Sequence, residues 1–152
     1  MRIALGMLLI TVCATAADDR AQVMAVVHKL FEGMAARDAA AIADTMMADA
    51  RIIAAQDKIG AARTRDDFAE RIRANESQIV ERMWKPTVLV RGRIAMLWAD
   101  YDVHVGGKFN HCGIDSFMLL KTDAGWKISQ VEYTSETQNC KPSPLGPLSG
   151  KR

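Results

Sequence analysis

The chain has 152 residues, of which 49% are hydrophobic and 25% charged, with 20 basic against 18 acidic side chains. This composition is that of one folded domain large enough to have its own core. The charge is nearly balanced and the sequence shows no concentrated basic face, which excludes the usual kind of nucleic-acid binder.

The N-terminal residues have the pattern of a signal peptide. Arg2 supplies a short positive region, residues 3–12 form an apolar run, and Ala14-Thr15-Ala16 is a small-residue cleavage site. The run is shorter than the roughly 20 residues that span a membrane. We therefore expect residues 1–17 to be removed and the mature protein to be periplasmic or secreted, with no membrane attachment. A lipid anchor at Cys13 is a weaker alternative, because the residue before it is bulky.

Three helices are expected before any long strand. An apolar stripe at helical spacing marks the first: Val23, Val26, Val27, Leu30, Phe31 and Met34. Asp38 and Thr64 are suitable N-caps for the second and third, and residues 50–55 read as a short strand between them. Basic residues interspersed with acidic ones in the third region indicate a solvated helix face: Arg63, Arg65, Arg71 and Arg73.

Consecutive strands are expected after the third helix, because the apolar period changes to two. Residues 79–85 form the first, and Pro86 interrupts it, which indicates an edge strand or a bulge. Gly106-Gly107 predicts a two-residue hairpin turn, and Asp123-Ala124-Gly125 a three-residue turn. Helices followed by a block of strands predict an α+β fold.

The two turns set a register that gathers polar side chains. With Val105 opposite Lys108, Asp102 lies opposite His111. The same register places these residues on one face, as a predicted pocket: Trp98, Asp100, Asp102, His111, Asp115 and Phe117. The second turn pairs Thr122 with Trp126 and so puts Tyr133 opposite Asp115. A four-residue turn would put Glu132 there instead.

The other face of the same hairpin is also mainly apolar in this register. It carries these residues of the first strand: Ala95, Leu97, Ala99, Tyr101 and Val103. One face is expected to be covered by the helices, and a homodimer is the simple way to cover the second. A loop, the C-terminal segment or partial exposure are the alternatives.

Cysteine content and the C-terminal composition add two expectations. Signal cleavage leaves Cys112 and Cys140, and two cysteines in an exported protein predict one disulfide. The alternative is a buried Cys112 thiol and a free Cys140. Residues 141–152 are rich in Pro, Gly and Ser without periodicity, and we expect them to be disordered.

Several motifs together resemble a known family. They are Leu30-Phe31-Glu32-Gly33-Met34, Asp38, Arg63, Phe68, and residues 98–102, 107–109, 111–117 and 125–128. On these residues the chain resembles the nuclear transport factor 2-like superfamily. Within it, the chain is most similar to the exported SnoaL-like or lumazine-binding branch. The resemblance implies a cone over residues 18–140, in which a strongly curved sheet wraps around helices and leaves a pocket at the wide end. Members include isomerases, dehydratases, hydrolases and transport adaptors, so the fold does not give the function.

Three hypotheses for function follow. The first is a domain that holds a mostly apolar small molecule in the conical pocket. The second is a cofactor-independent lyase or isomerase in which His111 and Asp115 act as an acid–base pair, with Tyr133 or Asp102. The third is a dimeric interaction module without activity. The alternative without a function for Asp102 and His111 is a cross-strand contact that contributes less than ~1 kcal/mol to stability. We expect no cofactor, and no metal, because HxxxH and CxxC patterns are absent.

Overall fold

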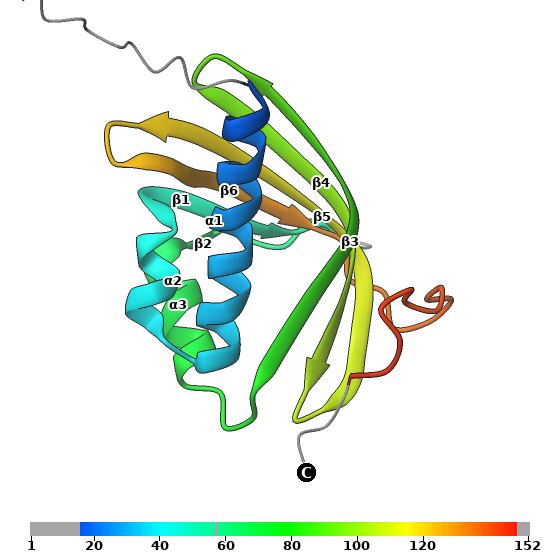
Figure 1. Ribbon diagram of the computed structural model, residues 1–152. Coiled ribbons are helices and arrows are strands. Elements are labelled where there is room, and N and C mark those ends of the chain that lie inside the picture. The colour runs from blue at the N-terminus through cyan, green and yellow to red at the C-terminus, as the bar shows by residue number, and fades with distance from the viewer. Residues whose placement is uncertain (1–15, 57, 149–152) are drawn as a thin grey trace, which may run out of the picture.

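The computed structural model describes residues 16–56 and 58–148, in which three helices pack on one curved six-stranded sheet (Figure 1). The helices are α1 (Ala16–Ala36), α2 (Ala39–Asp44) and α3 (Arg65–Arg73). The strands are β1 (Met46–Ala54), β2 (Arg63–Thr64), β3 (Ile79–Arg91), β4 (Ile94–Val105), β5 (Lys108–Thr122) and β6 (Gly125–Tyr133). The predicted α+β class is confirmed. The predicted signal peptide falls, but for its last two residues, outside the described ranges and stays a prediction.

Helices α2 and α3 begin at the predicted caps, and the predicted apolar stripe of α1 is buried. Asp38 caps α2 by accepting a hydrogen bond from the Ala41 backbone N–H at 3.0 Å, and Thr64 caps α3 by accepting from Asp67 at 3.1 Å. Five members of the α1 stripe are at most 7% exposed: Val23, Val27, Leu30, Phe31 and Met34. The stripe therefore faces the concave side of the sheet, and the helices cover that side.

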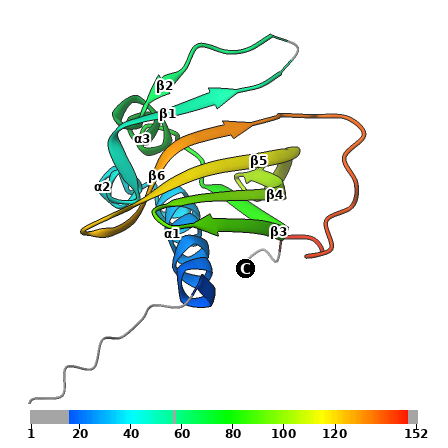
Figure 2. The same cartoon turned by 90° about the horizontal axis from the view of Figure 1, so that it is seen from above.

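The strands follow the order β2-β1-β6-β5-β4-β3, with β1 parallel to β6 and every other neighbouring pair antiparallel. Seen from above, the sheet bends around α1 (Figure 2). β3 forms one edge, and its pairing with β4 shifts between Trp84 and Thr87, around Pro86. The edge and the bulge that Pro86 indicated are thus both present.

A bulge at Asn110 changes the register that the first turn predicts. Val105 pairs with Lys108 and His104 with Phe109, but the next pair is Val103 with His111, so Asn110 has no partner on β4. One extra residue exchanges the faces of β4 relative to β5, because side chains alternate along a strand. The predicted pairing of Asp102 with His111 is therefore wrong, and Asp102 lies opposite Cys112.

The second hairpin contains two deviations that cancel. Thr122 pairs with Gly125 rather than with Trp126, so the turn has two residues and not three. A second shift between Met118 and Leu119 restores the register, and Asp115 pairs with Tyr133 as predicted.

The segment after β6 is held against β5 and the outer side of the sheet. Cys112 and Cys140 form a disulfide. The Thr134 carbonyl accepts a hydrogen bond from the Tyr101 hydroxyl at 2.5 Å. It also approaches β5 so closely that a Cβ added to Gly113 would lie 2.4 Å from its oxygen. Only glycine fits a crossing this tight.

The C-terminal residues up to 148 run along the outer side of the sheet (Figure 1). There Arg82 donates to the Gly146 carbonyl at 3.0 Å and forms a bidentate ion pair with Asp102 at 2.6 and 2.8 Å. This segment is one of the covers that the sequence left open for the second sheet face. The predicted disorder of residues 141–152 stays a prediction.

Candidate functional site

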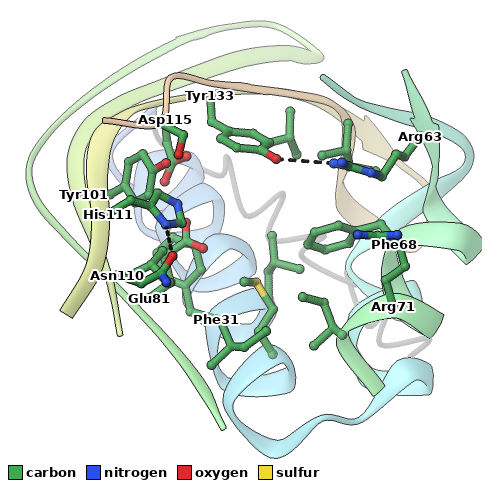
Figure 3. A pocket seen from close by; sticks show the side chains of 18 of the residues that line it. Phe31, Arg63, Phe68, Arg71, Glu81, Tyr101, Asn110, His111, Asp115 and Tyr133 are labelled. Carbon is green, nitrogen blue, oxygen red and sulfur yellow. Dashed lines mark hydrogen bonds between the residues drawn. The ribbon is translucent and has the colours of Figure 1, made fainter. Parts of the chain in front are cut away.

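A cavity of about 330 Å³ opens between the helices and the concave face of the sheet (Figure 3). Its apolar wall comes from both layers: Leu30, Phe31, Met34, Met46, Ile52, Phe68, Ile72, Ile79, Val103, Val105, Phe117 and Val131. Polar residues also line it: Gln56, Arg63, Arg71, Asn75, Glu81, Tyr101, Asn110, His111, Asp115, Tyr133 and Ser135. Its volume falls at the lower end of the ~300–1,000 Å³ typical of ligand pockets, which suits a small molecule.

Two carboxyl groups meet on one side of this cavity. Glu81 on β3 pairs with Val103, which is the β4 residue opposite His111, so Glu81 faces inward with the His111 and Asp115 side of β5. Asp115 is 2% exposed, and its Oδ2 has no hydrogen-bond donor among the described residues. Glu81 lies deep in the fold but keeps some accessible surface, because it faces the open cavity.

The pair keeps a proton at pH values where an ordinary carboxyl group has lost it. Burial raises the pKa of Asp115 to about 7. Burial, and next the charge of Asp115, raise the pKa of Glu81 well above its ordinary value. The two carboxyls are close enough to hydrogen-bond once one is protonated. A proton on Glu81 therefore supplies the donor that Asp115 lacks, and the pair carries one negative charge in place of two.

Tyr101 and His111 extend this acidic side of the cavity. Their rings pack edge to face with centroids 5.6 Å apart. Burial, followed by the charge of Asp115, raises the pKa of Tyr101, so its hydroxyl stays protonated. Burial lowers the pKa of His111, which favours the neutral ring. His111 Nδ1 lies 2.8 Å from Asn110 Oδ1, and the neutral tautomer that donates there leaves Nε2 as an acceptor.

The opposite side of the cavity is cationic and aromatic. Figure 3 shows Arg63, Phe68 and Arg71 across from Glu81 and Asp115. Arg63 enters from β2, where it pairs with the cavity residue Ile52, and it donates to the Tyr133 hydroxyl at 3.3 Å. On α3 the cavity residues follow helical spacing, since Phe68, Arg71 and Ile72 recur at i, i+3 and i+4.

The structure brings together four of the residues that the sequence singled out. His111, Asp115, Phe117 and Tyr133 all line the cavity. Whether His111 and Asp115 are catalytic stays a prediction.

The other three predicted pocket residues do not line the cavity. Trp98, Asp100 and Asp102 belong to the outer face of β4, because the Asn110 bulge exchanges the two faces. Trp98 is 48% exposed, and Asp102 is buried against Arg82. Asp102 is therefore excluded as a partner of His111. The face predicted to lie opposite this pocket, with Leu97, Ala99 and Tyr101, is the concave one instead.

Sequence reasoning missed the carboxyl of Glu81 and misplaced two arginines. Glu81 stands alone between the buried residues Ile79 and Met83 at strand spacing, and this pattern is a usable signal for an inward-facing acid. Arg63 and Arg71 were expected on a solvated helix face. Arg63 instead belongs to a short strand, and both side chains line the cavity.

The described residues offer no group of three or more histidine, cysteine or acidic side chains arranged to hold a metal ion. Within residues 16–56 and 58–148, none of the helices has the length and apolar character that crossing a membrane requires.

Comparison of structures identifies the class to which this fold belongs. An NTF2-like protein with a cystatin-like fold from Novosphingobium aromaticivorans shares 18% identity over 82% of this chain and 85% of its own, with a TM-score of 0.67. An NTF2-like superfamily protein from Salmonella enterica matches at 14% identity over 83% and 96%, with a TM-score of 0.67. A protein from Streptomyces avermitilis named a “putative dehydratase from the NTF2-like family” matches at 18% over 80% and 98%, with a TM-score of 0.66. At these identities the likeness shows the fold, which is that of the nuclear transport factor 2-like superfamily.

Within that superfamily the sequence identifies a particular family. Residues 18–134 match the family described as “Putative lumazine-binding”, and the chain belongs to it. No curated protein matches the chain.

Proposed function

We propose that this protein binds a small, mostly apolar molecule in the cavity between its helices and its sheet. One observation carries the proposal: the cavity of about 330 Å³ has an apolar wall and a few convergent polar groups, as ligand sites do. The family description, which names lumazine, supports a small-molecule ligand of some kind.

Native mass spectrometry of the protein purified gently from its own host tests the proposal. We expect a non-covalent adduct whose mass begins the identification of the ligand. Ser135→Trp replaces a residue that lines the cavity with a large ring and should remove the adduct. Thr137→Trp, two residues on and outside the cavity lining, should keep it. In parallel, lumazine is titrated into adduct-free protein. An adduct that survives Ser135→Trp would locate the binding elsewhere and contradict the proposal.

The carboxyl pair favours a second function, which is cofactor-independent acid–base catalysis by a lyase or isomerase. An Asp115 carboxylate whose pKa is about 7 can take a proton from a carbon next to a carbonyl near neutral pH. The electron pair left on carbon forms an enolate, whose oxygen a protonated Glu81 or Tyr101 can stabilise by donating a hydrogen bond. The proton then returns at another carbon in an isomerase, or a leaving group departs in a lyase.

Proton exchange from an apolar ketone tests this second function. In D₂O, NMR follows loss of the α-protons of 4-phenylbutan-2-one, which we expect the protein to accelerate over buffer. Asp115→Asn should abolish the acceleration, and Asp100→Asn, which removes a carboxylate from the outer face of β4, should leave it unchanged. Exchange at the buffer rate, or equal rates in both variants, would leave only the binding function.

Export supplies the setting that we propose for this activity. The apolar N-terminal run supports a periplasmic or secreted location, and so does the disulfide between Cys112 and Cys140. Expression of the full chain in a bacterial host, followed by fractionation and intact mass measurement, tests this. We expect a mature chain beginning near Ala17 in the periplasm or medium. An uncleaved chain in the cytoplasm would contradict the proposed location.

A further inference from the structure

We propose that the ligand is an apolar carboxylic acid, whose carboxylate binds Arg63 and Arg71 while its apolar body lies against the cavity wall. This inference rests on the proposed binding function and adds the chemical class of the ligand. It is carried by two guanidinium groups that line the cavity without an acidic partner among the described residues.

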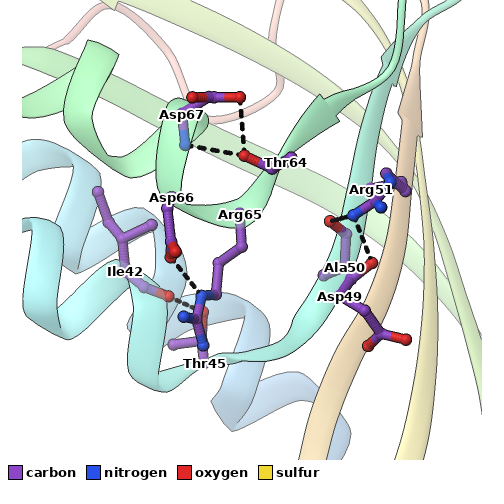
Figure 4. Close-up of polar contacts among 9 residues, drawn as sticks. All are labelled: Ile42, Thr45, Asp49, Ala50, Arg51, Thr64, Arg65, Asp66 and Asp67. Carbon is purple, nitrogen blue, oxygen red and sulfur yellow. Dashed lines mark hydrogen bonds and ion pairs between the residues drawn. The ribbon is translucent and has the colours of Figure 1, made fainter.

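The local structure delivers both arginines to the cavity by separate means. β2 pairs antiparallel with β1, with Arg63 opposite Ile52 and Thr64 opposite Arg51. Ile52 is 1% exposed and lines the cavity, so Arg63 shares the inward face. Thr64 then ends the strand and caps α3 (Figure 4), and the helix presents Arg71 two turns later.

Two acidic residues share a depression with these arginines, and both already have hydrogen-bond partners. Asp67 and Glu70 line a depression beside the cavity together with Arg63 and Arg71. However, Asp67 accepts a hydrogen bond from the Thr64 hydroxyl at 2.8 Å, and Glu70 forms a bidentate pair with Arg73 on the next turn. Arg63 has one side-chain hydrogen bond in the described part of the chain, to the neutral Tyr133 hydroxyl. The guanidinium donors on this side therefore remain for a ligand.

The two sides of the cavity also do not neutralise each other. Arg63 and Arg71 lie across from Glu81 and Asp115 in Figure 3, and no ion pair between the two sides is formed among the described residues. Burial raises the pKa of both carboxyls, the charge of Asp115 raises that of Glu81 further, and neither arginine contributes to these shifts. This side thus presents two guanidinium groups, without an ion-pair partner among the described residues, at one end of an apolar cavity. A planar oxyanion is the group that a guanidinium binds best.

The surroundings favour a carboxylate over a phosphate. Asp67 and Glu70 line the adjoining depression, and their charges would repel a dianion at Arg63 and Arg71 more strongly than a monoanion. Phe68 and Phe31 line the same cavity as the two arginines, so a head group at Arg63 and Arg71 is continuous with a chain or ring that lies against these aromatic side chains (Figure 3).

A matched pair of probes separates the charge from the apolar body. Isothermal titration calorimetry at pH 7.5 compares 4-phenylbutyrate with 4-phenylbutan-1-ol, which has the same skeleton and no charge. We expect the acid to bind at least about tenfold more tightly. Arg63→Gln and Arg71→Gln should each weaken binding of the acid about threefold and leave binding of the alcohol unchanged. The double variant should lose the whole preference, about tenfold, and bind both equally.

Arg51→Gln is the control for net charge. Arg51 lies on the neighbouring strand but outside the cavity. Its guanidinium donates hydrogen bonds to the Asp49 and Ala50 carbonyls at 2.8 and 3.2 Å (Figure 4). The Arg51→Gln variant should keep the full preference for the acid over the alcohol. Arg63 is half-buried, so its replacement could unfold the protein. A thermal unfolding curve for each variant checks this, and Arg63→Lys, which keeps the charge, is a second control.

The outcomes distinguish this inference from the function on which it rests. Equal binding of acid and alcohol by the wild-type protein, both lost in Ser135→Trp, would keep the cavity as a binding site and overturn the carboxylate assignment. A preference for the acid that survives the double arginine substitution would overturn it too. Failure of both probes to bind would count against the binding function itself for molecules of this size.

Discussion

Glu81 and Asp115 give the free energy of unfolding a pH dependence that rests on a single pair of side chains. The folded state raises the pKa of both, so it holds their protons more tightly than the unfolded chain does. Their contribution to the free energy of unfolding is therefore full below the ordinary aspartate pKa of 3.8 and is lost as pH rises through about 7. The direction is opposite to that of a carboxylate in a salt bridge.

Glu81→Gln should remove much of this dependence, because the amide donates a hydrogen bond to Asp115 at every pH. We expect the variant to gain about 2 kcal/mol over the wild type between pH 5 and pH 8, or roughly 5–10 °C in Tm. Calorimetric Tm values across this range measure the gain. Glu76→Gln, at an exposed position, is the control and should follow the wild type. Parallel curves for Glu81→Gln and the wild type would show that the pair does not share a proton.

Among the elements, the segment that follows β6 is fixed at one crossing on β5. Gly113→Ala would bring a methyl group to 2.4 Å from the Thr134 carbonyl oxygen, which must then move away from the Tyr101 hydroxyl. We expect a loss of about 2–3 kcal/mol in the free energy of unfolding, measured by urea titration. Ser116→Ala, on the outer face of the same strand, should change it by less than about 0.5 kcal/mol. A neutral Gly113→Ala would show that the crossing is loose.

The disulfide fixes the same segment a second time. It joins residues 28 apart in sequence, and closing a loop of that length stabilises a fold by about 3.5 kcal/mol in the chain-entropy estimate. Reduction should therefore lower the wild-type free energy of unfolding by about that amount. The double variant Cys112→Ser with Cys140→Ser should already be weakened and should not respond to reductant. An equal response of both proteins would exclude the bond as the cause.

The elements show where sequence reasoning holds and where it ends. Asp38, Thr64 and Gly106-Gly107 act through bonds within a few residues, and all three give the caps and the turn expected of them. Asn110 and the shift after Met118 have no such local signature, because a bulge depends on how two strands and their neighbours pack.

Those bulges decide which side chains of β4 and β5 reach the cavity. The Asn110 bulge alone moves Asp102 out of the predicted pocket, although His111 and Asp115 were placed on the correct face of their own strand. Glu81 was inside a predicted strand, but the partner and register of that strand were not fixed. Its position beside Asp115 depends on how β3 pairs with the other strands, which the periodicity of β3 alone does not predict.

The whole molecule leaves one apolar surface without a cover in the described part of the chain. The helices fill the concave face and the C-terminal segment lies near Arg82 and Asp102, but an outer patch across β3, β4 and β5 stays exposed. Its members and their exposed fractions are Leu89 54%, Ile94 55%, Trp98 48% and Met118 36%. Leu89 and Met118 both pair with Met96, so the patch is a continuous row over three strands. We propose that a second copy of the chain covers it, as a homodimer.

Trp98→Lys should dissociate this dimer, because it places a charge within the patch, where the partner would desolvate it. Sedimentation velocity measures the change from a dimer to a monomer at the same protein concentration. Phe109→Lys is the matched control, because Phe109 is 49% exposed at the end of the β4–β5 hairpin and outside the patch. It should leave the dimer intact. Since the cavity lies on the other face of the sheet, the monomeric Trp98→Lys protein should still bind the cavity ligand. A wild-type monomer would leave the outer patch exposed and overturn the proposed homodimer.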